Sequence, residues 1–318
     1  MTFASTTGAP TSVLLIFNPT AGRRRRGLVD AVVRRVRSLG WTVDVVETAA
    51  PGDARRHAEQ CDAGRYGVIA VAGGDGTINE VVNGLAARAA TAPPLALVPL
   101  GTANVLAHEL GLGSTASALA QAITAGREVL MHPGQASGAG RPRCFSLMAG
   151  AGFDAKVVAG VSAPLKRRWG KIAYVWRSLV EAWRYRPVRY AIEIDGVRHE
   201  AASVIVTHAR HYAGPYVVAP EASLDAPLLH VCLFERWGWV HALRFGAALV
   251  LGTLPRTPGY RVVAGRQVRI SVLNDAGEER RQPVQIDGDD ALTLPVSIGL
   301  STEAVRLLRP ASPHAAGP

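Results

Sequence analysis

Three short loops rich in glycine, threonine and asparagine carry the residue types that best fit phosphate binding. In order along the chain they are Asn18-Pro19-Thr20-Ala21-Gly22, Gly73-Gly74-Asp75-Gly76-Thr77 and Pro99-Leu100-Gly101-Thr102-Ala103-Asn104. Glycine lets a ligand approach the backbone because no Cβ stands in the way. Backbone amides at a helix start bind phosphate without a Walker sequence. Each loop taken singly is typical of an ordinary turn, whereas the three together favour a phosphate-binding rim.

The middle loop is the strongest of these signals and predicts the start of a helix. Thr77 and Glu80 have the spacing of a capping box, so the sequence predicts that this helix begins at Thr77. Asp75 is unusual here, because a carboxylate repels phosphate unless a cation or a protonated hydroxyl lies between them. Its presence indicates Mg²⁺ or a base role; the alternative is that Asp75 only stabilises a glycine-rich turn.

Three acids lie close together late in the sequence, at Asp287, Asp289 and Asp290. Phosphoryl transfer to an alcohol needs a carboxylate that orients or deprotonates the hydroxyl, together with Mg²⁺ that bridges the phosphates. Such a negative field in a cleft requires a cation or a raised pKa, so we expect one of the three to be a base or a metal partner. Asp-Gly is also a strong hairpin signal, and spacing alone favours a solvent-exposed turn.

Alternating strand and helix patterns occupy the first third of the chain and must position the three loops. The order is strand 13–17, helix 28–39, strand 41–47, helix 53–61, strand 66–72, helix 78–87 and strand 95–99. This alternation predicts an α/β domain, a parallel sheet with helices on both faces. Ligands of such sheets bind at the carboxyl ends of the strands, where all three loops begin.

The pattern changes after about residue 125. Helical stretches at 154–160 and 165–185 are followed by β-like runs at 188–194, 202–206, 228–234, 268–272, 284–286 and 296–300. Runs of strands at this spacing predict an antiparallel second domain. We therefore expect an α/β domain over residues 1–126 and a β-rich domain over residues 127–301, with a tail, 302–313, that could pack back on the first domain.

Composition sets the broad class of the protein. The chain has 318 residues, of which 48% are hydrophobic, and this excludes intrinsic disorder and fits two domains. A formal net charge of +10 favours anionic partners such as nucleotide phosphates or an acidic membrane surface. Three widely spaced cysteines and the lack of a signal-peptide pattern predict a cytoplasmic protein without a disulfide framework or a zinc cluster. The apolar run 245–254 is too short to span a bilayer.

Taken with later motifs, the three loops resemble the diacylglycerol kinase catalytic family, the lipid kinase group that also contains sphingosine and ceramide kinases. The similarity extends to residues 150–154, to residues 214–222 and to Ile286-Asp287-Gly288-Asp289, so the motifs occur in order over nearly the whole chain. The Gly-Gly-Asp-Gly-Thr element alone is shared with NAD kinases. The resemblance implies a two-domain kinase that holds ATP and substrate between an α/β domain and a β-sandwich-like domain.

The resemblance also implies roles for individual residues. The proton acceptor matches Asp289, which replaces the family's usual Glu, with Asp287 and Asp75 as further catalytic candidates. Asp is one methylene shorter, so its carboxylate would reach the hydroxyl through water or after a small loop shift. Ala226 occupies the position of an Asp that holds a structural Mg²⁺ in bacterial members, so we expect that site to be empty. The nucleotide-binding positions match Asn18, Pro19, Thr20, Ala21, Gly22, Thr48, Gly73, Gly74, Asp75, Gly76, Thr77, Asn79 and Thr102.

These observations predict a cytoplasmic, peripherally membrane-associated kinase that uses ATP and Mg²⁺ to phosphorylate a hydroxyl of a diacylglycerol-like or sphingoid lipid. Cations and aromatic residues mixed over 166–186 suggest docking on an anionic membrane surface, with a core-packed helix as the alternative. The runner-up functions are an NAD kinase-like enzyme for a soluble substrate and a non-catalytic nucleotide- or lipid-binding regulator. No nucleic-acid-binding pattern occurs, and the oligomeric state, a homodimer included, stays open.

Overall fold

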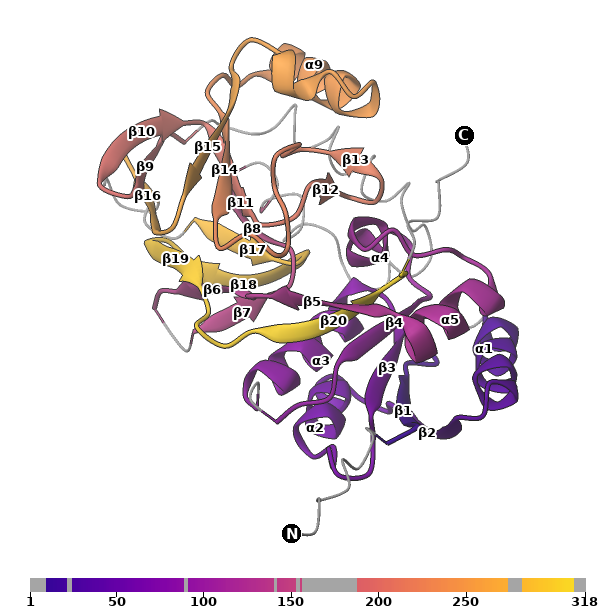
Figure 1. The fold of residues 1–318 in the computed structure, drawn as a ribbon. Helices are drawn as coiled ribbons and strands as arrows, with labels where there is room; N and C mark the ends of the chain where they lie inside the picture. The colour runs from indigo at the N-terminus through magenta and orange to yellow at the C-terminus, as the bar shows by residue number, and fades with distance from the viewer. Residues whose placement is uncertain are drawn as a thin grey trace, which may run out of the picture. The chain divides into compact units, whose positions relative to one another are not determined.

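A computed structural model describes residues 10–21, 25–88, 91–139, 142–152, 155, 188–273 and 282–311, except for the side chains of residues 290 and 291. The chain divides into two compact units (Figure 1). The first unit consists of Met1–Gly101, Leu110–Leu130 and Val305–Pro318, and the second consists of Thr102–Glu109 and Met131–Ala304. Both units are therefore built from segments that are separated in the sequence.

The first unit contains a six-stranded sheet in the order β2-β1-β3-β4-β20-β5. β1 pairs in parallel with β2 and β3, β3 pairs in parallel with β4, and β20 lies parallel to β4. The predicted parallel sheet is confirmed, and a strand from the far end of the chain takes part in it. The strands are β1 (Ser12–Phe17), β2 (Thr42–Glu47), β3 (Val68–Gly73), β4 (Leu95–Pro99), β5 (Arg127–Met131) and β20 (Val305–Arg309).

Helices cover both faces of this sheet (Figure 1). α1 and α5 share a hydrophobic core with β1 and β3, and α2 contacts α3. α1 forms because its buried valines, at positions 29, 32, 33 and 36, recur at helical spacing and give it one apolar side. β1 and β3 are almost entirely apolar and buried, as strands covered on both faces must be. The helices are α1 (Arg26–Ser38), α2 (Asp53–Glu59), α3 (Asp75–Ala86) and α5 (Ala116–Ala125).

The second unit is a sandwich of two six-stranded antiparallel sheets. Apolar side chains from both sheets form one hydrophobic core between them, which confirms the predicted antiparallel second half. One sheet has the order β10-β9-β16-β19-β6-β7 and the other β15-β14-β11-β8-β17-β18. The strands are β6 (Gly134–Ser137), β7 (Arg143–Phe145), β8 (Met148–Ala151), β9 (Tyr190–Ile194), β10 (Val197–Ala201), β11 (Ser203–Thr207), β14 (Leu229–Phe234), β15 (Tyr260–Gly265), β16 (Val268–Val272), β17 (Pro283–Ile286), β18 (Asp289–Thr293) and β19 (Val296–Leu300).

Shorter elements complete the second unit. They are α4 (Val105–Glu109), the hairpin of β12 (His211–Tyr212) and β13 (Tyr216–Val217), α9 (Trp239–Val250) and the 3₁₀ helix η1 (Leu254–Arg256). Sequence patterns did not predict α9 or the strands β6, β7, β8, β10, β12, β13, β15 and β18. The helices expected over 165–185 and over most of 154–160 lie outside the described residues.

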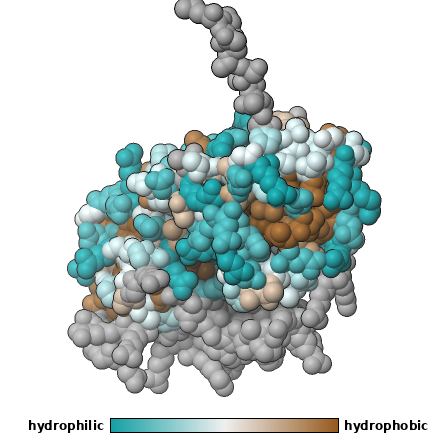
Figure 2. Space-filling model, turned by 90° about the horizontal axis from the view of Figure 1, so that it is seen from below, coloured by the Kyte–Doolittle hydropathy of each residue, from teal (hydrophilic) through white to brown (hydrophobic). Residues whose placement is uncertain are grey.

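The surface of the described residues carries both polar and apolar side chains. Figure 2 shows hydrophilic residues over much of one face, with a patch of hydrophobic residues among them. Within the described ranges, no helix is both long enough and apolar enough to cross a membrane. Large exposed apolar side chains include Leu39 and Val45 in the first unit and several residues of α9 in the second.

Candidate functional site

Parallel pairing brings the predicted loops of the first unit to one edge of the sheet. The backbone N–H of Asn18, just past β1, donates to the Ala72 carbonyl of β3 at 2.9 Å. The N–H of Leu100, just past β4, donates to the Gly73 carbonyl at 2.9 Å. The loops after β1, β3 and β4 therefore begin side by side, as the strand-edge rule predicts.

The Asn18 side chain shapes the first loop and ties it to the second. Its Nδ2 donates to Thr77 Oγ1 at 2.8 Å. Its Oδ1 accepts from the Thr20 N–H at 3.0 Å, the Thr20 hydroxyl at 2.8 Å and the Ala21 N–H at 3.3 Å. An amide is the side chain that can donate on one side and accept on the other, which explains an asparagine at this position.

The glycines of the second loop serve different purposes. A Cβ on Gly73 would lie 2.6 Å from the Cβ of Thr77, and a Cβ on Gly74 would lie 3.3 Å from the Cα of Gly101. Close packing thus requires small residues at these two positions. A Cβ on Gly76 would meet no atom within 4 Å, and Gly76 is exposed. The open space at Gly76 is available to a ligand.

Helix α3 begins at Asp75, two residues before the predicted start. Gly74 is the N-cap with an extended backbone, and no side chain caps the helix, so the predicted capping box of Thr77 and Glu80 is wrong. The physical reason is that Thr77 lies inside the first turn, where its hydroxyl accepts from Asn18. The first amides of a helix have no acceptor within the helix. Those of Gly76 and Thr77 are therefore suited to a phosphate.

Asp75 and Asn79 lie on the first turns of α3, and both are half-buried. Asn79 Oδ1 accepts from Asn83 Nδ2 at 2.9 Å. The Asp75 carboxylate adjoins the helix start, so a phosphate bound there would need a cation between the two anions. The described residues contain no group of three or more His, Cys, Asp or Glu side chains arranged to hold a metal by themselves. Asp75 fits a cation that arrives with the nucleotide phosphates.

The loop after β2 reaches the same edge of the sheet. The N–H of Thr48 donates to the Phe17 carbonyl at the end of β1 at 2.9 Å. Asp53 then fixes the loop, because its carboxylate accepts from the amides of Ala49 at 2.9 Å and Ala50 at 3.0 Å. These two amides hold the pKa of Asp53 below its ordinary value. Thr48 is thus held beside the β1 loop.

Two of the four arginines that follow the first loop have defined partners. Arg25 donates to the Pro99 carbonyl at 3.3 Å, and Arg26 pairs with Glu47 at 2.9 Å. Both partners stand at the carboxyl ends of strands, β4 and β2. Gly22, Arg23 and Arg24 lie outside the described residues.

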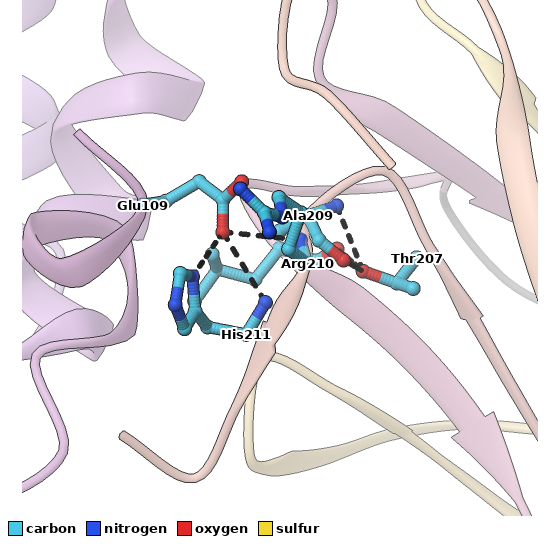
Figure 3. Close-up of polar contacts among 6 residues, drawn as sticks. Glu109, Thr207, Ala209, Arg210 and His211 are labelled. Carbon is cyan, nitrogen blue, oxygen red and sulfur yellow. Dashed lines mark hydrogen bonds and ion pairs between the residues drawn. The ribbon is translucent and has the colours of Figure 1, made fainter. Parts of the chain in front are cut away.

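The third loop leads into the second unit, to which Thr102 belongs and where it is exposed. It ends at α4, whose last residue, Glu109, is a buried acid that the sequence analysis did not identify. Glu109 Oε2 accepts from the Arg210 N–H at 3.0 Å, the His211 N–H at 3.2 Å and His211 Nδ1 at 2.6 Å (Figure 3). The two side chains are 5% and 19% exposed. Glu109 therefore fastens α4 to β12 across 102 positions of sequence, a separation that no local pattern reveals.

Asp287 and Gly288 form the turn between β17 and β18. Both have positive φ angles, 48° and 85°, as a two-residue type I′ hairpin requires. The backbone therefore confirms the prediction that Asp287-Gly288 forms a hairpin turn. Asp289, the first residue of β18, has an exposed side chain. The Asp290 side chain lies outside what the structure describes.

The Asp287 carboxylate is anchored by four donors from the segment between β7 and β8. Its Oδ2 accepts from the Ser146 N–H at 2.6 Å and the Ser146 hydroxyl at 2.8 Å. Its Oδ1 accepts from the amides of Leu147 at 3.0 Å and Met148 at 2.9 Å. Burial raises the pKa of Asp287 to about 6, against the pull of these four donors. Because a carboxylate has about four lone-pair sites, this anchoring occupies all of them.

Ser146 also connects this anchor to a buried histidine. His208 Nε2 lies 3.0 Å from the Ser146 carbonyl oxygen, and its ring packs edge-on against Phe145. Burial lowers the pKa of His208 to about 4, so the ring is neutral at physiological pH. The segment that anchors the Asp287 turn therefore also contacts a buried histidine that carries no charge.

The segment around Ala226 forms a turn. The Ala226 N–H donates to the Ser223 carbonyl at 3.1 Å, and the Ser223 hydroxyl contacts the Asp225 carboxylate. Ala226 offers no oxygen ligand from its side chain, and Asp225 is engaged within the turn. That this position holds no structural Mg²⁺ stays a prediction.

The candidate residues therefore fall into two groups. The first unit gathers Asn18–Ala21, Thr48, Gly73–Thr77 and Asn79 at or beside one sheet edge. The second unit holds Thr102, Asp287 and Asp289. Their chemical roles stay predictions.

Comparison with known proteins gives matches over both units. The model described as diacylglycerol kinase catalytic domain matches residues 12–136, and the model described as YegS C-terminal NAD kinase beta sandwich-like domain matches residues 148–309. A diacylglycerol kinase of Bacillus subtilis (strain 168) is 27% identical over 286 residues, which cover 88% of this chain and 90% of that protein. A probable YegS-like lipid kinase of Pseudomonas putida is 34% identical over 211 residues, which cover 64% of this chain and 68% of that protein.

A crystal structure of a diacylglycerol kinase from Bacillus anthracis str. Sterne has the same fold. It superposes with a TM-score of 0.74 at 23% sequence identity and covers 95% of this chain and 98% of that one. The motifs, the two-unit fold and the matches over both units agree with one another. The chain therefore belongs to the diacylglycerol kinase family of lipid kinases, with a catalytic domain followed by a YegS-type β-sandwich domain.

Proposed function

We propose that this ATP-dependent lipid kinase binds the triphosphate of ATP at the first-unit sheet edge and phosphorylates a diacylglycerol-like lipid. The kinase activity follows from the family. The choice of a diacylglycerol-like acceptor is supported by relatives that are named diacylglycerol kinase. The observation that carries the nucleotide assignment is the open space at Gly76, beside the amides of Gly76 and Thr77, which have no acceptor within α3.

In this proposal the residues at the sheet edge bind the phosphates and form no covalent bond with them. The amides of Gly76 and Thr77 donate to phosphate oxygens, and Asn18 keeps the loops after β1 and β3 in register through its bonds to Thr20 and Thr77. Thr48 supplies a further polar contact. Preorganised donors of this kind stabilise charge that develops on the transferred phosphoryl group, which is the main source of catalysis in phosphoryl transfer.

Asp75 is the residue that would hold a Mg²⁺ ion bound to the nucleotide. It is half-buried at the first position of α3, next to the amides assigned to phosphate. A Mg²⁺ ion held there would supply positive charge that offsets the negative charge of the phosphates during transfer. Asp75 itself would keep the cation, and with it the terminal phosphate, at the helix start.

We propose that Asp289 accepts the proton of the lipid hydroxyl and that Asp287 positions Asp289. Asp287 has no lone pair to spare, because Ser146, Leu147 and Met148 donate to it. Asp289 follows two residues later on β18 with an exposed side chain. The anchored turn would therefore fix where the Asp289 carboxylate stands.

A kinase assay with a lipid panel tests this function. Wild type, Asp75→Asn and Asp289→Asn are incubated with labelled ATP, Mg²⁺ and a diacylglycerol, a sphingoid base, a ceramide or NAD. We expect label in the organic phase with diacylglycerol, and a loss of at least 100-fold in kcat for both variants, on the order of a general-base or charge-stabilising contribution. Label that stays in the aqueous phase with NAD would indicate the soluble-substrate kinase.

Two further outcomes are informative. If nucleotide binds while wild type and both variants transfer no label, the protein is a regulator that kept the fold and lost turnover.

The pH profile of kcat/KM identifies which carboxylate acts as the base. If an acid limb near pH 6 vanishes in Asp287→Asn and persists in Asp289→Asn, the proton belongs to Asp287 and our assignment is wrong.

A further inference from the structure

Helix α9 carries apolar side chains on two opposite sides. Phe245 and Ala248 are buried and attach the helix to the second unit, where the Phe245 ring meets Phe234 edge-on at 5.3 Å. The opposite side is exposed and equally apolar. Its large residues are Trp239 at 63% exposure, Val240 at 54%, Leu243 at 49%, Val250 at 63% and, just past the helix, Leu251 at 74%.

The spacing of these residues makes the exposed side continuous. Positions 239, 243 and 250 differ by four and seven, so they stack along one line of the helix, and Val240 and Leu251 widen that line. A soluble helix ordinarily turns polar residues outward. An exposed apolar strip of this kind marks a surface that meets another apolar phase.

The sequence around the strip is mainly basic, with Glu235 before the helix as an acid that pairs with Arg261. Between Arg236 and Leu273 the sequence contains six arginines and no Asp or Glu. Arg236, Arg244 and Arg256 are exposed, and within the described ranges none of the three forms an ion pair. Arg244 lies within α9 itself. Long cationic side chains beside an apolar strip can bury their stems and keep their heads in a polar layer.

We propose that α9 is the segment that docks this enzyme on an anionic bilayer. The apolar strip enters the boundary between headgroups and acyl chains, Trp239 sits at headgroup level, and the arginines pair with lipid phosphates. The proposal rests on the lipid kinase function, because the substrate of such an enzyme resides in a membrane. A second copy of the chain fits less well, since joining two α9 strips would bring two sets of arginines together, and the nearby acid Glu235 is already paired with Arg261.

Vesicle co-sedimentation with a matched pair of double variants tests the docking. Leu243→Ser/Val250→Ser removes apolar area from α9, and Leu39→Ser/Val45→Ser removes the same residue types from exposed positions of the first unit. Serine has a helix propensity close to that of valine and only a few tenths of a kcal/mol below that of leucine, so α9 should stay folded, which circular dichroism checks. On vesicles of phosphatidylcholine with phosphatidylglycerol, we expect the α9 variant to bind at least about tenfold more weakly than wild type and the control to bind as wild type does.

Brominated acyl chains give a second, position-specific readout. They should quench the tryptophan emission of bound wild type, and the quenched fraction should fall in Trp239→Phe. Binding should also weaken on vesicles of phosphatidylcholine alone and at high salt, because the arginine contribution is electrostatic. Equal vesicle binding by wild type and the α9 variant, or an equal loss in both double variants, overturns the proposal. So does a wild-type dimer that the α9 variant converts to monomer while its vesicle binding is unchanged.

A soluble substrate separates this proposal from the proposed function. Wild type and the α9 variant should phosphorylate a short-chain diacylglycerol, dispersed as monomers, at the same rate. If both do so and wild type does not bind vesicles, docking by α9 is wrong and the kinase function stands. If no lipid is phosphorylated and vesicle binding still depends on α9, the function fails and the docking stands.

Discussion

Alanine substitutions at Gly73 and Gly76 separate packing from ligand binding within a single loop. The Cβ of Gly73→Ala would lie 2.6 Å from Thr77 Cβ and 2.9 Å from Thr77 Oγ1. Thr77 is buried, and its hydroxyl accepts from Asn18. Thr77 can therefore make room only by breaking that bond or by displacing the start of α3. The Cβ of Gly76→Ala meets no protein atom within 4 Å.

The two substitutions should change the free energy of unfolding by different amounts and in opposite directions. Overpacking costs about 1–3 kcal/mol and a lost hydrogen bond about 1 kcal/mol, so Gly73→Ala should lower the free energy of unfolding by about 2–4 kcal/mol. That corresponds to a Tm lower by roughly 5–10 °C. Gly76 is a helical residue, and alanine there should stabilise the fold by about 0.5–1 kcal/mol. The new methyl group would occupy the space assigned to phosphate and should weaken ATP binding about tenfold or more.

Thermal unfolding followed by circular dichroism and titration with a fluorescent ATP analogue measure both effects on the same samples. Wild-type stability in Gly73→Ala would show that the contact with Thr77 relaxes without cost and that the glycine is not needed for packing. Wild-type affinity in Gly76→Ala, with the protein folded, would show that phosphate does not bind at the start of α3. Either result would refute the corresponding part of the argument.

Three further changes probe other contacts. Asn18→Asp keeps an acceptor for its loop but places a negative charge at the phosphate rim, so steady-state kinetics should show KM for ATP raised about tenfold, and loss of the Nδ2 donor to Thr77 should lower the free energy of unfolding by about 1 kcal/mol. Glu109→Gln weakens the contact with His211 and should lower the free energy of unfolding in urea by about 1–3 kcal/mol. His208 has a lowered pKa, so the unfolded chain binds its proton first. As pH falls from 6.5 to 4, wild type should lose about 3 kcal/mol more of its free energy of unfolding in urea than His208→Gln, while the opposite contribution of Asp287, whose pKa is raised, is common to both.

Local sequence patterns were sufficient to predict the strands and helices that position the loops of the first unit. β1 and β3 are continuous apolar runs with glycine or asparagine after them, and α1 has valines at helical spacing. Each signal lies within about a dozen residues, and the rule for parallel sheets then places the loops at one edge. The start of α3 was predicted wrongly because the spacing of Thr77 and Glu80 fits a capping box. The hydroxyl of Thr77 instead serves Asn18, 59 positions earlier.

Contacts between distant segments could not be predicted in the same way. The turn at Asp287 was readable from Asp-Gly, but its anchor at Ser146 is 141 positions away. Glu109 and His211 are 102 positions apart, and neither stands in a recognisable motif. The exposed strip of α9 was hidden for a different reason: an apolar helix looks the same in sequence whether its outer side is covered or bare.

The position of β20 has a consequence for biosynthesis. This strand lies between β4 and β5 in the first-unit sheet, yet residues 132–304 separate it from β5 along the chain. While the polypeptide is still emerging from the ribosome, β4 and β5 have no partner between them, and the sandwich unit can finish folding first. Closing the sheet is then a late event of high contact order, so a chain that stalls before residue 305 would expose two bare strand edges to aggregation or proteolysis.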